Sequence, residues 1–354
     1  MTTVPSLVDR LTTALTAWGV PFVVSTLIVM LVAVSIILGY ISVAAMFLIW
    51  WERKISAHIQ VRYGPMREGG WHGWAQSIAD GIKLLLKEDI IPSGADKVVF
   101  VLAPMVVFAA SVASYVTIPW GPGIIVQDLN IGILYMVAIS SLVVVGIIMA
   151  GWSSNNKYAT LGAMRSAAQA VSYEVPLVLS LLGPVMIAGT MSMGGLVEAQ
   201  GGTWLGFLPR WFVFPQMVAF LTYFTCALAE CNRLPFDIPE AESELVAGFH
   251  VEYSGMRFAM FFLAEYANML VVAAIATTLF LGGWQGPWIR LPGLPPAVAH
   301  ALFGLFWFQL KCYLLIFVMM WLRWTLARLR VDQLMDFAWK VLLPIAFANL
   351  IITG

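Results

Sequence analysis

Charged side chains are scarce in this chain. Of its 354 residues only 11% are charged and 61% are hydrophobic, whereas a soluble domain is about one quarter charged. The mean hydropathy is +0.88, so we expect membrane spans and not soluble domains. Lys plus Arg and Asp plus Glu both number 19, so the net charge is zero. Nothing in this balance indicates a nucleic acid as partner.

Signatures of cofactor binding are also missing. The three cysteines (Cys226, Cys231 and Cys312) form no CxxC pair and have no histidine at ligand spacing. This argues against a disulfide framework, a zinc site or an iron–sulfur cluster and favours small buried apolar residues. The chain has no Walker loop, no dinucleotide-binding fingerprint, no histidine pair for haem and no nucleophile–base arrangement. We expect no redox cofactor and no metal in this chain, so that any electron chemistry belongs to a partner.

Long apolar runs predict an all-α, polytopic membrane protein, a single membrane domain over residues 1–354 with about eight transmembrane helices. Each run can cross roughly 30 Å of hydrocarbon, some only just, and helices satisfy the backbone there. The first run is too long for a cleavable signal peptide, and no internal repeat supports an inverted-repeat transporter. The predicted spans are 22–50, 98–119, 131–152, 170–190, 211–230, 258–283, 302–324 and 337–353.

Basic residues gather in alternate connections between these spans. By the positive-inside rule, those connections face the cytoplasm, and both termini lie on the outer side of a bacterial plasma membrane. The connections 51–97, 152–169, 231–257 and 323–340 hold 15 of the 19 Lys and Arg residues.

The first cytoplasmic connection contains a segment, residues 70–88, that is too polar for a span. Trp74, Ile78, Ile82 and Leu85 recur at helical spacing, with the charged residues off that stripe. This pattern predicts an amphipathic helix. Two interpretations stay open: the helix lies in the membrane interface on the cytoplasmic side, or it is a soluble connector packed on a partner.

The third cytoplasmic connection, 231–257, is strongly acidic. Asp237 is expected to cap a helix that has Pro239 in its first turn and continues past Glu244. Glu240 and Glu244 would then share a face, where repulsion raises at least one carboxyl pKa and lets a proton be shared. The alternative is a solvated helix start favoured by the helix dipole.

Several ionisable residues lie within the apolar runs or at their ends, namely Glu174, Glu265, Lys311, Glu52 and Arg53. Ionisable groups inside a membrane are rare and mark proton or ligand paths. Glu52 and Arg53 are adjacent, which suggests that they pair at the interface. Together these residues indicate a polar file across part of the membrane domain, and the alternative is a set of buried ion pairs that fix helix packing.

Four blocks of cytoplasmic sequence carry a family resemblance. They are ERKISAHIQVRYGPMREGG at 52–70 with QSIADGIKLLLKEDIIP at 76–92, GWSSNNKYATLGAMRSAAQAVSYEVPL at 151–177, the acidic stretch from AECNRLPFDIPEAE through FFLAEYANM at 229–269, and LRVDQLMDFAWKVLLP at 329–344. They span almost the whole chain in the family's order. The chain resembles the membrane subunit of respiratory complex I that is called H in bacteria and subunit 1 of NADH dehydrogenase in mitochondria. Met66 departs from the asparagine usual in the family.

The resemblance implies eight transmembrane helices, an amphipathic helix after the first, and a quinone chamber between this subunit and two peripheral-arm subunits. Quinone is then the substrate, iron–sulfur clusters and FMN belong to partner subunits, and small and antiporter-like membrane subunits are further partners. The positions that match the chamber are Glu52, Arg53, Arg62, Asp80, Arg233, Phe236, Asp237, Glu240, Glu242 and Glu244. A carboxylate path toward the antiporter-like subunits would use Glu174, Glu230, Glu252 and Glu265, with countercharges from Lys157, Arg165, Arg330 and Asp332.

The expected function is thus that of a membrane subunit of a proton-translocating NADH:quinone oxidoreductase. It would form the quinone channel and link quinone reduction to proton pumping through carboxylates. The chain has no site for an electron donor, so the same module in a ferredoxin-, coenzyme F420- or hydrogenase-linked complex remains an alternative. Two further functions stay open, namely a stand-alone ion transporter and a purely structural anchor.

Overall fold

The computed structural model describes the chain except residues 1–6, 205–207 and 288–294. Seven of the described helices are long and apolar enough to cross a membrane, which confirms the predicted all-α, polytopic fold. These helices are α2 (Phe22–Ile59), α4 (Lys97–Ala113), α5 (Gly132–Ser153), α6 (Lys157–Ala188), α10 (Gly255–Phe280), α11 (Pro296–Thr325) and a last helix made of α12 (Val331–Asp336), a π-helical turn (Phe337–Leu342) and α13 (Leu343–Thr353).

The remaining elements are short and connect these helices. They are α1 (Leu7–Ala17), α3 (Gln76–Leu86), α7 (Met193–Ala199), α9 (Glu242–Leu245), the antiparallel pair β1 (Thr203–Trp204) and β2 (Leu208–Pro209), and single helical turns at Trp71–Gly73, Ser114–Thr117 and Gly248–His250.

The predicted span 211–230 contains a shorter helix than expected. Helix α8 covers Met217–Glu230, 14 residues, which rise about 21 Å against roughly 30 Å of hydrocarbon. The residues before it form turns, and among them the amide of Phe212 donates to Oε1 of Gln200 (3.2 Å). The described part of the chain therefore has seven long helices and one short apolar helix.

Helix α10 lies at the centre of the bundle. Every residue from Met269 to Phe280 is buried, as expected for a helix that is apolar on all sides. Helices α4, α11, α2 and α3 all pack on α10. Ala273, Ala274 and Ala276 are among these buried residues, and alanine lets helix backbones approach closely within a membrane. Helix α10 thus brings together groups from the whole bundle.

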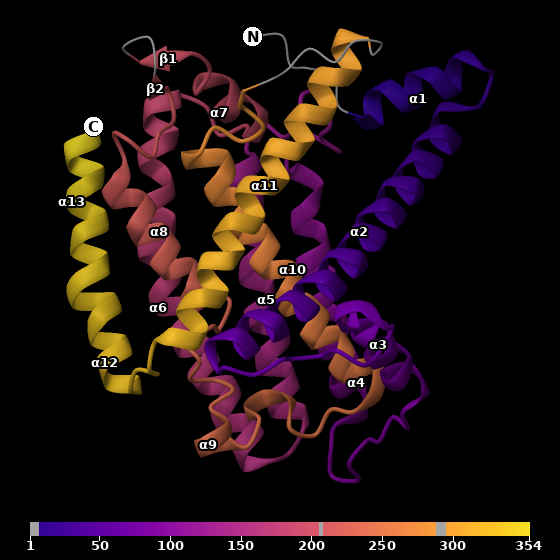
Figure 1. Cartoon of the computed structure of the whole chain (residues 1–354), viewed down its shortest axis with the longest axis vertical. Helices are drawn as coiled ribbons and strands as arrows, with labels where there is room; N and C mark the ends of the chain where they lie inside the picture. Colours follow the sequence, from indigo (N-terminus) through magenta and orange to yellow (C-terminus); the bar gives the residue numbers. More distant parts are fainter. Residues whose placement is uncertain (1–6, 205–207, 288–294) are drawn as a thin grey trace.

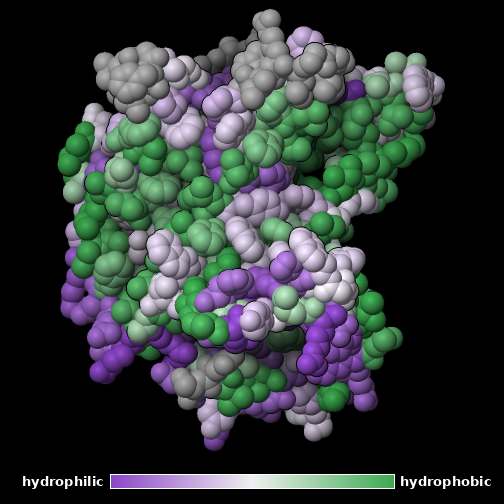
Figure 2. All heavy atoms as spheres, viewed as in Figure 1, coloured by the Kyte–Doolittle hydropathy of each residue, from purple (hydrophilic) through white to green (hydrophobic). Residues whose placement is uncertain are grey.

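The two ends of the bundle differ in character. Helix α1 and the C-terminus of α13 lie at one end, and α3 and α9 lie at the other (Figure 1). Apolar residues cover most of the face in Figure 2, and hydrophilic residues gather toward the end that carries α3 and α9. That the end with α1 and the C-terminus faces the outer side of the membrane stays a prediction from the basic residues.

Helix α2 does not end at residue 50, as the predicted span does. It continues to Ile59, so the connection that is predicted to face the cytoplasm begins inside a helix, with Glu52 and Lys54 buried. Lys54 is tied to the following turn, because its Nζ donates to the carbonyl of Pro65 (2.5 Å) and lies 3.1 Å from Sδ of Met66. The methionine that departs from the family pattern is therefore a contact of a buried lysine.

The amphipathic helix is present but shorter than residues 70–88. It covers only Gln76–Leu86, because glycines with positive φ precede it (φ 76° at Gly70 and 63° at Gly73). Its apolar stripe has little cover from the described chain: Ile82 is 53% and Leu85 66% exposed. The stripe is thus available to the membrane interface or to a partner, as both interpretations require.

Lys311, in the middle of α11, is buried and fully hydrogen-bonded. Its Nζ donates to the carbonyls of Leu281 (2.6 Å), Gly283 (3.0 Å) and Gln285 (2.6 Å), just beyond the C-terminus of α10. The ammonium also lies 4.4 Å from the ring centre of Trp211. A cation at a helix C-terminus complements the helix dipole and satisfies its last carbonyls. The structure favours the packing role for Lys311 over a role in a proton path.

Replacing this lysine should loosen the contact between α10 and α11. Lys311→Met leaves three carbonyls without their donor, a loss of about 1–3 kcal/mol for buried groups. We expect a lower midpoint of thermal unfolding for the detergent-solubilised protein. Lys340→Met, which removes only an exposed pair with Asp336, is the control and should change the midpoint little. Equal shifts in the two variants would contradict this role of Lys311.

Candidate functional site

Five side chains from four parts of the chain form a buried charge cluster (Glu52, Arg233, Glu265, Tyr266 and Arg323). Nη1 of Arg233 donates to both carboxylate oxygens of Glu52 (2.8 and 3.0 Å), and its Nε lies 2.8 Å from Glu265. Arg323 and the hydroxyl of Tyr266 also bond to Glu52. The side chain of Arg233 is only 2% exposed. Two carboxylates and two guanidinium groups balance, as buried charges require.

The predicted pairing of Glu52 with Arg53 is wrong. Neighbouring residues project about 100° apart around a helix, so Glu52 points into the bundle and Arg53 points toward α3. There Nη1 of Arg53 lies 2.6 Å from Asp80, which also contacts Lys83 at 3.6 Å. This second pairing ties α2 to the amphipathic helix. Arg62 joins neither group, because it is exposed and bonds to Gln60.

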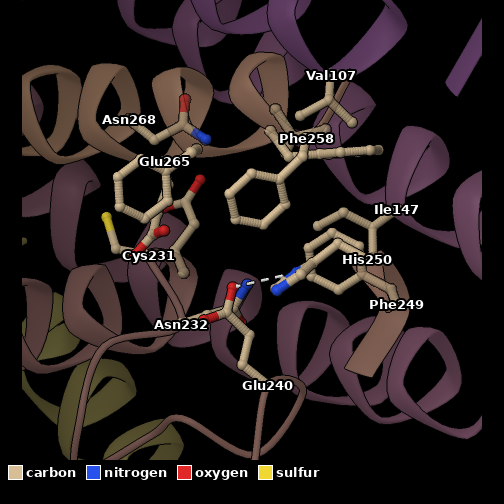
Figure 3. A pocket seen from close by; sticks show the side chains of 14 residues that line it. Val107, Ile147, Cys231, Asn232, Glu240, Phe249, His250, Phe258, Glu265 and Asn268 are labelled. Carbon is tan, nitrogen blue, oxygen red and sulfur yellow. Dashed lines mark ion pairs between the residues drawn. The ribbon is translucent and has the colours of Figure 1, made fainter. Parts of the chain in front are cut away.

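A small cavity adjoins the charge cluster (Figure 3). It has a volume of about 50 Å³, enough for a few water molecules. Half of the lining residues are aromatic or aliphatic, and the polar ones come from the C-terminal end of α8 and the loop after it, the turn Gly248–His250 and α10. We call it the carboxylate cavity after Glu230, Glu240 and Glu265, which line it together with Asn232, Asn268 and His250.

Glu265 belongs to both the charge cluster and the carboxylate cavity. It is partly buried (18% exposed) and comes from α10. Asp237 lies near enough for its charge to act on Glu265. A change of charge at Arg233 or Glu52 must therefore alter the proton affinity of a carboxylate that faces the cavity.

Two carboxylates, Glu230 at the end of α8 and Glu174 of α6, lie near α5. Ser140 of α5, whose hydroxyl donates to the carbonyl of Val137 (2.9 Å), lies near Glu230, and the charges of Glu230 and Glu174 act on each other. Ser141, the next residue, donates to Glu174 of α6. Glu252 lies apart from Glu230 and Glu174. Its carboxylate accepts a hydrogen bond from the side chain of Asn156 (2.6 Å) at the start of α6.

The prediction of a helix that starts after Asp237 in the acidic connection is wrong. Helix α9 is a single turn that begins at Glu242 and not after Asp237. The segment before it is held by tertiary contacts instead. The side chain of Gln169 donates to the carbonyl of Phe236 (2.8 Å), and the Phe236 ring packs on Tyr173 (5.3 Å).

Glu240 and Glu244 consequently do not share a helix face. Glu240 lies 3.8 Å from His250 at the cavity, whereas Glu244 lies 2.7 Å from Arg165 and is exposed. The hydrogen bond from Arg165 lowers the pKa of the Glu244 carboxyl, so the rise predicted for at least one of the two carboxyls does not occur at Glu244. The backbone of Glu242 is in α9, and its side chain lies outside the described residues.

Of the predicted countercharges, only Arg165 contacts a carboxylate of the acidic connection, as far as the described residues show. Arg330 pairs with Asp332 at 3.3 Å, both exposed, and Lys157 is exposed beside the ring of Tyr158.

Sequence reasoning misses three members of the site, which are Arg323, Tyr266 and His250. Arg323 resembles any basic residue at the end of a predicted span, Tyr266 carries no charge, and His250 has no second histidine at ligand spacing. Among the described residues, no group of three or more His, Cys, Asp or Glu could hold a metal ion.

Together these features define a polytopic helical membrane protein whose charged groups are buried at one end of the bundle, beside a small cavity lined by carboxylates. The family model for NADH dehydrogenase matches residues 19–354. The chain belongs to this family.

Curated relatives cover most of the chain. A protein of Dehalococcoides mccartyi strain CBDB1 is 52% identical over 325 residues, which is 92% of this chain and 86% of the relative. Proteins of Chlorobaculum tepidum (51% over 311 residues) and Geobacillus sp. strain WCH70 (48% over 303 residues) each cover 86% of both chains. All three are named as the H subunit of an NADH-quinone oxidoreductase.

The charge cluster predicts that Arg233 is needed for folding. Arg233→Met leaves Glu265 without its partner, and breaking a buried pair costs about 3–5 kcal/mol. We expect little of the variant chain in the membrane by immunoblot. Arg233→Met combined with Glu265→Gln should accumulate better, because the unpaired charge is gone. Arg53→Met, at the more exposed pair, is the control and should accumulate normally. Wild-type amounts of Arg233→Met alone would contradict the prediction.

Proposed function

We propose that this chain is the membrane subunit of a proton-translocating NADH:quinone oxidoreductase that admits quinone to its reduction site and links its reduction to proton movement. Membership of the NADH dehydrogenase family and the shared name of the relatives support the complex. The observation that supports the link between quinone reduction and proton movement is the position of Glu265. Its carboxylate forms an ion pair with Arg233 and also lines the carboxylate cavity.

Quinone reduction consumes two protons and changes the charge in a poorly solvated space. The charge cluster is suited to respond, because Arg233 is shared between Glu52 and Glu265. When Glu265 is protonated, Arg233 keeps only the Glu52 carboxylate, which Arg323 also binds. In a low dielectric such a redistribution changes proton affinities strongly.

The proposed proton file starts at the acidic connection and passes into the membrane domain. Glu240, Glu265 and Glu230 meet at the carboxylate cavity, where water can connect them. Ser140 and Ser141 then join Glu230 to Glu174. Carboxylates that are close in a poorly solvated site exchange protons as coupled groups.

The partners follow from the two ends of the bundle. We propose that the end with α3, α9 and the acidic connection faces the cytoplasm and receives the peripheral arm, whose subunits carry the flavin and the iron–sulfur clusters. The exposed ion pairs Arg165–Glu244 and Arg330–Asp332 lie in that region of the chain. Small and antiporter-like membrane subunits would adjoin the lipid-facing helices, and both termini would lie on the outer side.

The two rival functions differ in what they require of the buried groups. A stand-alone transporter would need Lys311 or the glutamates to carry an ion, but all three hydrogens of Lys311 are bound by carbonyls. A structural anchor would not need protonatable groups around a cavity. A related complex with another electron donor would use the same site, and the neighbouring genes for the donor subunits distinguish that case.

The function is tested by removing the proton-binding ability of Glu265. Glu265→Gln keeps the shape and a hydrogen-bond acceptor for Arg233 but cannot take up a proton. We expect NADH-driven quinone reduction and its coupled proton uptake in membranes to fall about tenfold or more, with normal electron transfer from NADH to a water-soluble acceptor. Glu198→Gln, at an exposed position of α7, is the matched control and should be unaffected.

Normal quinone reduction with normal proton uptake in Glu265→Gln would overturn the coupling role. Loss of the soluble-acceptor activity together with quinone reduction would instead report failed assembly. In that case a Glu230→Gln variant, which leaves the ion pair with Arg233 untouched, decides the question by the same assays.

A further inference from the structure

His250 is the one basic side chain in the wall of the carboxylate cavity, as far as the described residues show. Its Nδ1 lies 3.8 Å from Oε1 of Glu240, and its side chain is 15% exposed. At this distance a proton passes through one water molecule or after a small approach, since a direct hydrogen bond is shorter. The ring faces the same cavity as Glu265 (Figure 3), and Glu230 also lines this cavity.

Backbone contacts fix His250 relative to Glu240. Gly248, two residues before the histidine, has φ of 59°, and a Cβ there would lie 1.9 Å from the carbonyl oxygen of Pro239. A Cβ on Gly162 of α6 would lie 2.8 Å from Cα of Gly248. The turn is thus pressed between α6 and the residue that precedes Glu240. Only glycine permits both approaches, so the chain holds the imidazole opposite the carboxylate.

The surroundings keep the imidazole neutral near pH 7. The rings of Phe249 and Phe258 pack edge to face on it, at 5.0 and 5.4 Å. Burial lowers the pKa of His250 to about 4. The helices that form the cavity contribute apolar residues and the carboxylates Glu230 and Glu265, and the loop contributes Glu240. A neutral imidazole has one donor and one acceptor nitrogen, so it can take up and release a proton in turn.

We propose that His250 passes protons between Glu240 and the carboxylates on the far side of the cavity. The nitrogen that carries no hydrogen accepts a proton from the Glu240 side, and an imidazolium–carboxylate pair forms for a short time. The other nitrogen releases its hydrogen to water in the cavity, from which Glu265 or Glu230 takes it. One proton is transferred and the ring is neutral again, as its other tautomer.

This role rests on the proposed function and adds a residue to it. With a pKa of about 4, the imidazolium is a short-lived intermediate near pH 7, so the ring would relay protons and not store them. The competing explanation is that His250 only fills space between two phenylalanines. If His250 only fills space, any group of the same shape can replace it. If His250 transfers protons, the replacing group must also be a base.

The test separates shape from basicity. In the assembled complex in membranes, His250→Ala should reduce NADH-driven quinone reduction and coupled proton uptake about tenfold or more. Added imidazole should restore a large part of both rates, because it fits the vacated space and accepts protons. Pyrazole has almost the same shape but is a much weaker base, and should restore neither. Wild-type rates in His250→Ala, or equal restoration by the two azoles, would overturn the proposal.

A second variant covers the case in which His250→Ala does not assemble. His250→Asn keeps a polar side chain of similar reach that cannot take up a proton, and we expect it to assemble and stay slow. Wild-type turnover in His250→Asn would overturn the proposal. If Glu265→Gln is impaired and His250→Asn is not, the proposed function stands and the role of His250 falls. If both are normal, the proposed function itself falls.

Discussion

A charge that is buried within a membrane bundle must be compensated, and in this protein Arg233 compensates for two. Its guanidinium reaches Glu52 from α2 and Glu265 from α10 in one geometry. The loop after α8 therefore has to enter the bundle far enough to deliver that side chain. The long α2 has to carry Glu52 beyond the apolar part of its span. The acidic connection and the carboxylate cavity both adjoin this arginine.

The sequence predicts the membrane fold well because apolar runs of span length have few other outcomes. It predicts the ends of the helices less well, since those depend on partners. Helix α2 continues through Glu52 because Arg233, which is 181 residues away, neutralises it. Helix α8 begins only at Met217, after turns in which Gln200 binds the amide of Phe212. Neither contact can be predicted from the helix propensities of the neighbouring residues.

For the candidate site too, the sequence predicts the residue types well and their contacts poorly. Residue types and family blocks identify the carboxylates, and most of them do lie near one another. Pairings are wrong wherever they are inferred from adjacency or helical spacing. Glu240 and Glu244 are separated because Gln169 and Tyr173 hold the chain before α9 in an irregular path. Tyr266, His250 and Arg323 complete the site. Nothing in the sequence around them distinguishes them from other tyrosine, histidine and arginine residues of the chain.

The coupling proposed for this protein can act over a short distance. Glu265 touches the arginine on one side and the cavity on the other, so no long conformational relay is required between them. A proton on Glu265 weakens the hold on Arg233, and a movement of Arg233 toward Glu52 favours a proton on Glu265. By linkage these two effects are equal in free energy. Chemistry that changes the charge near Glu52 must therefore change proton occupancy at the cavity, and the reverse holds for protons that arrive there.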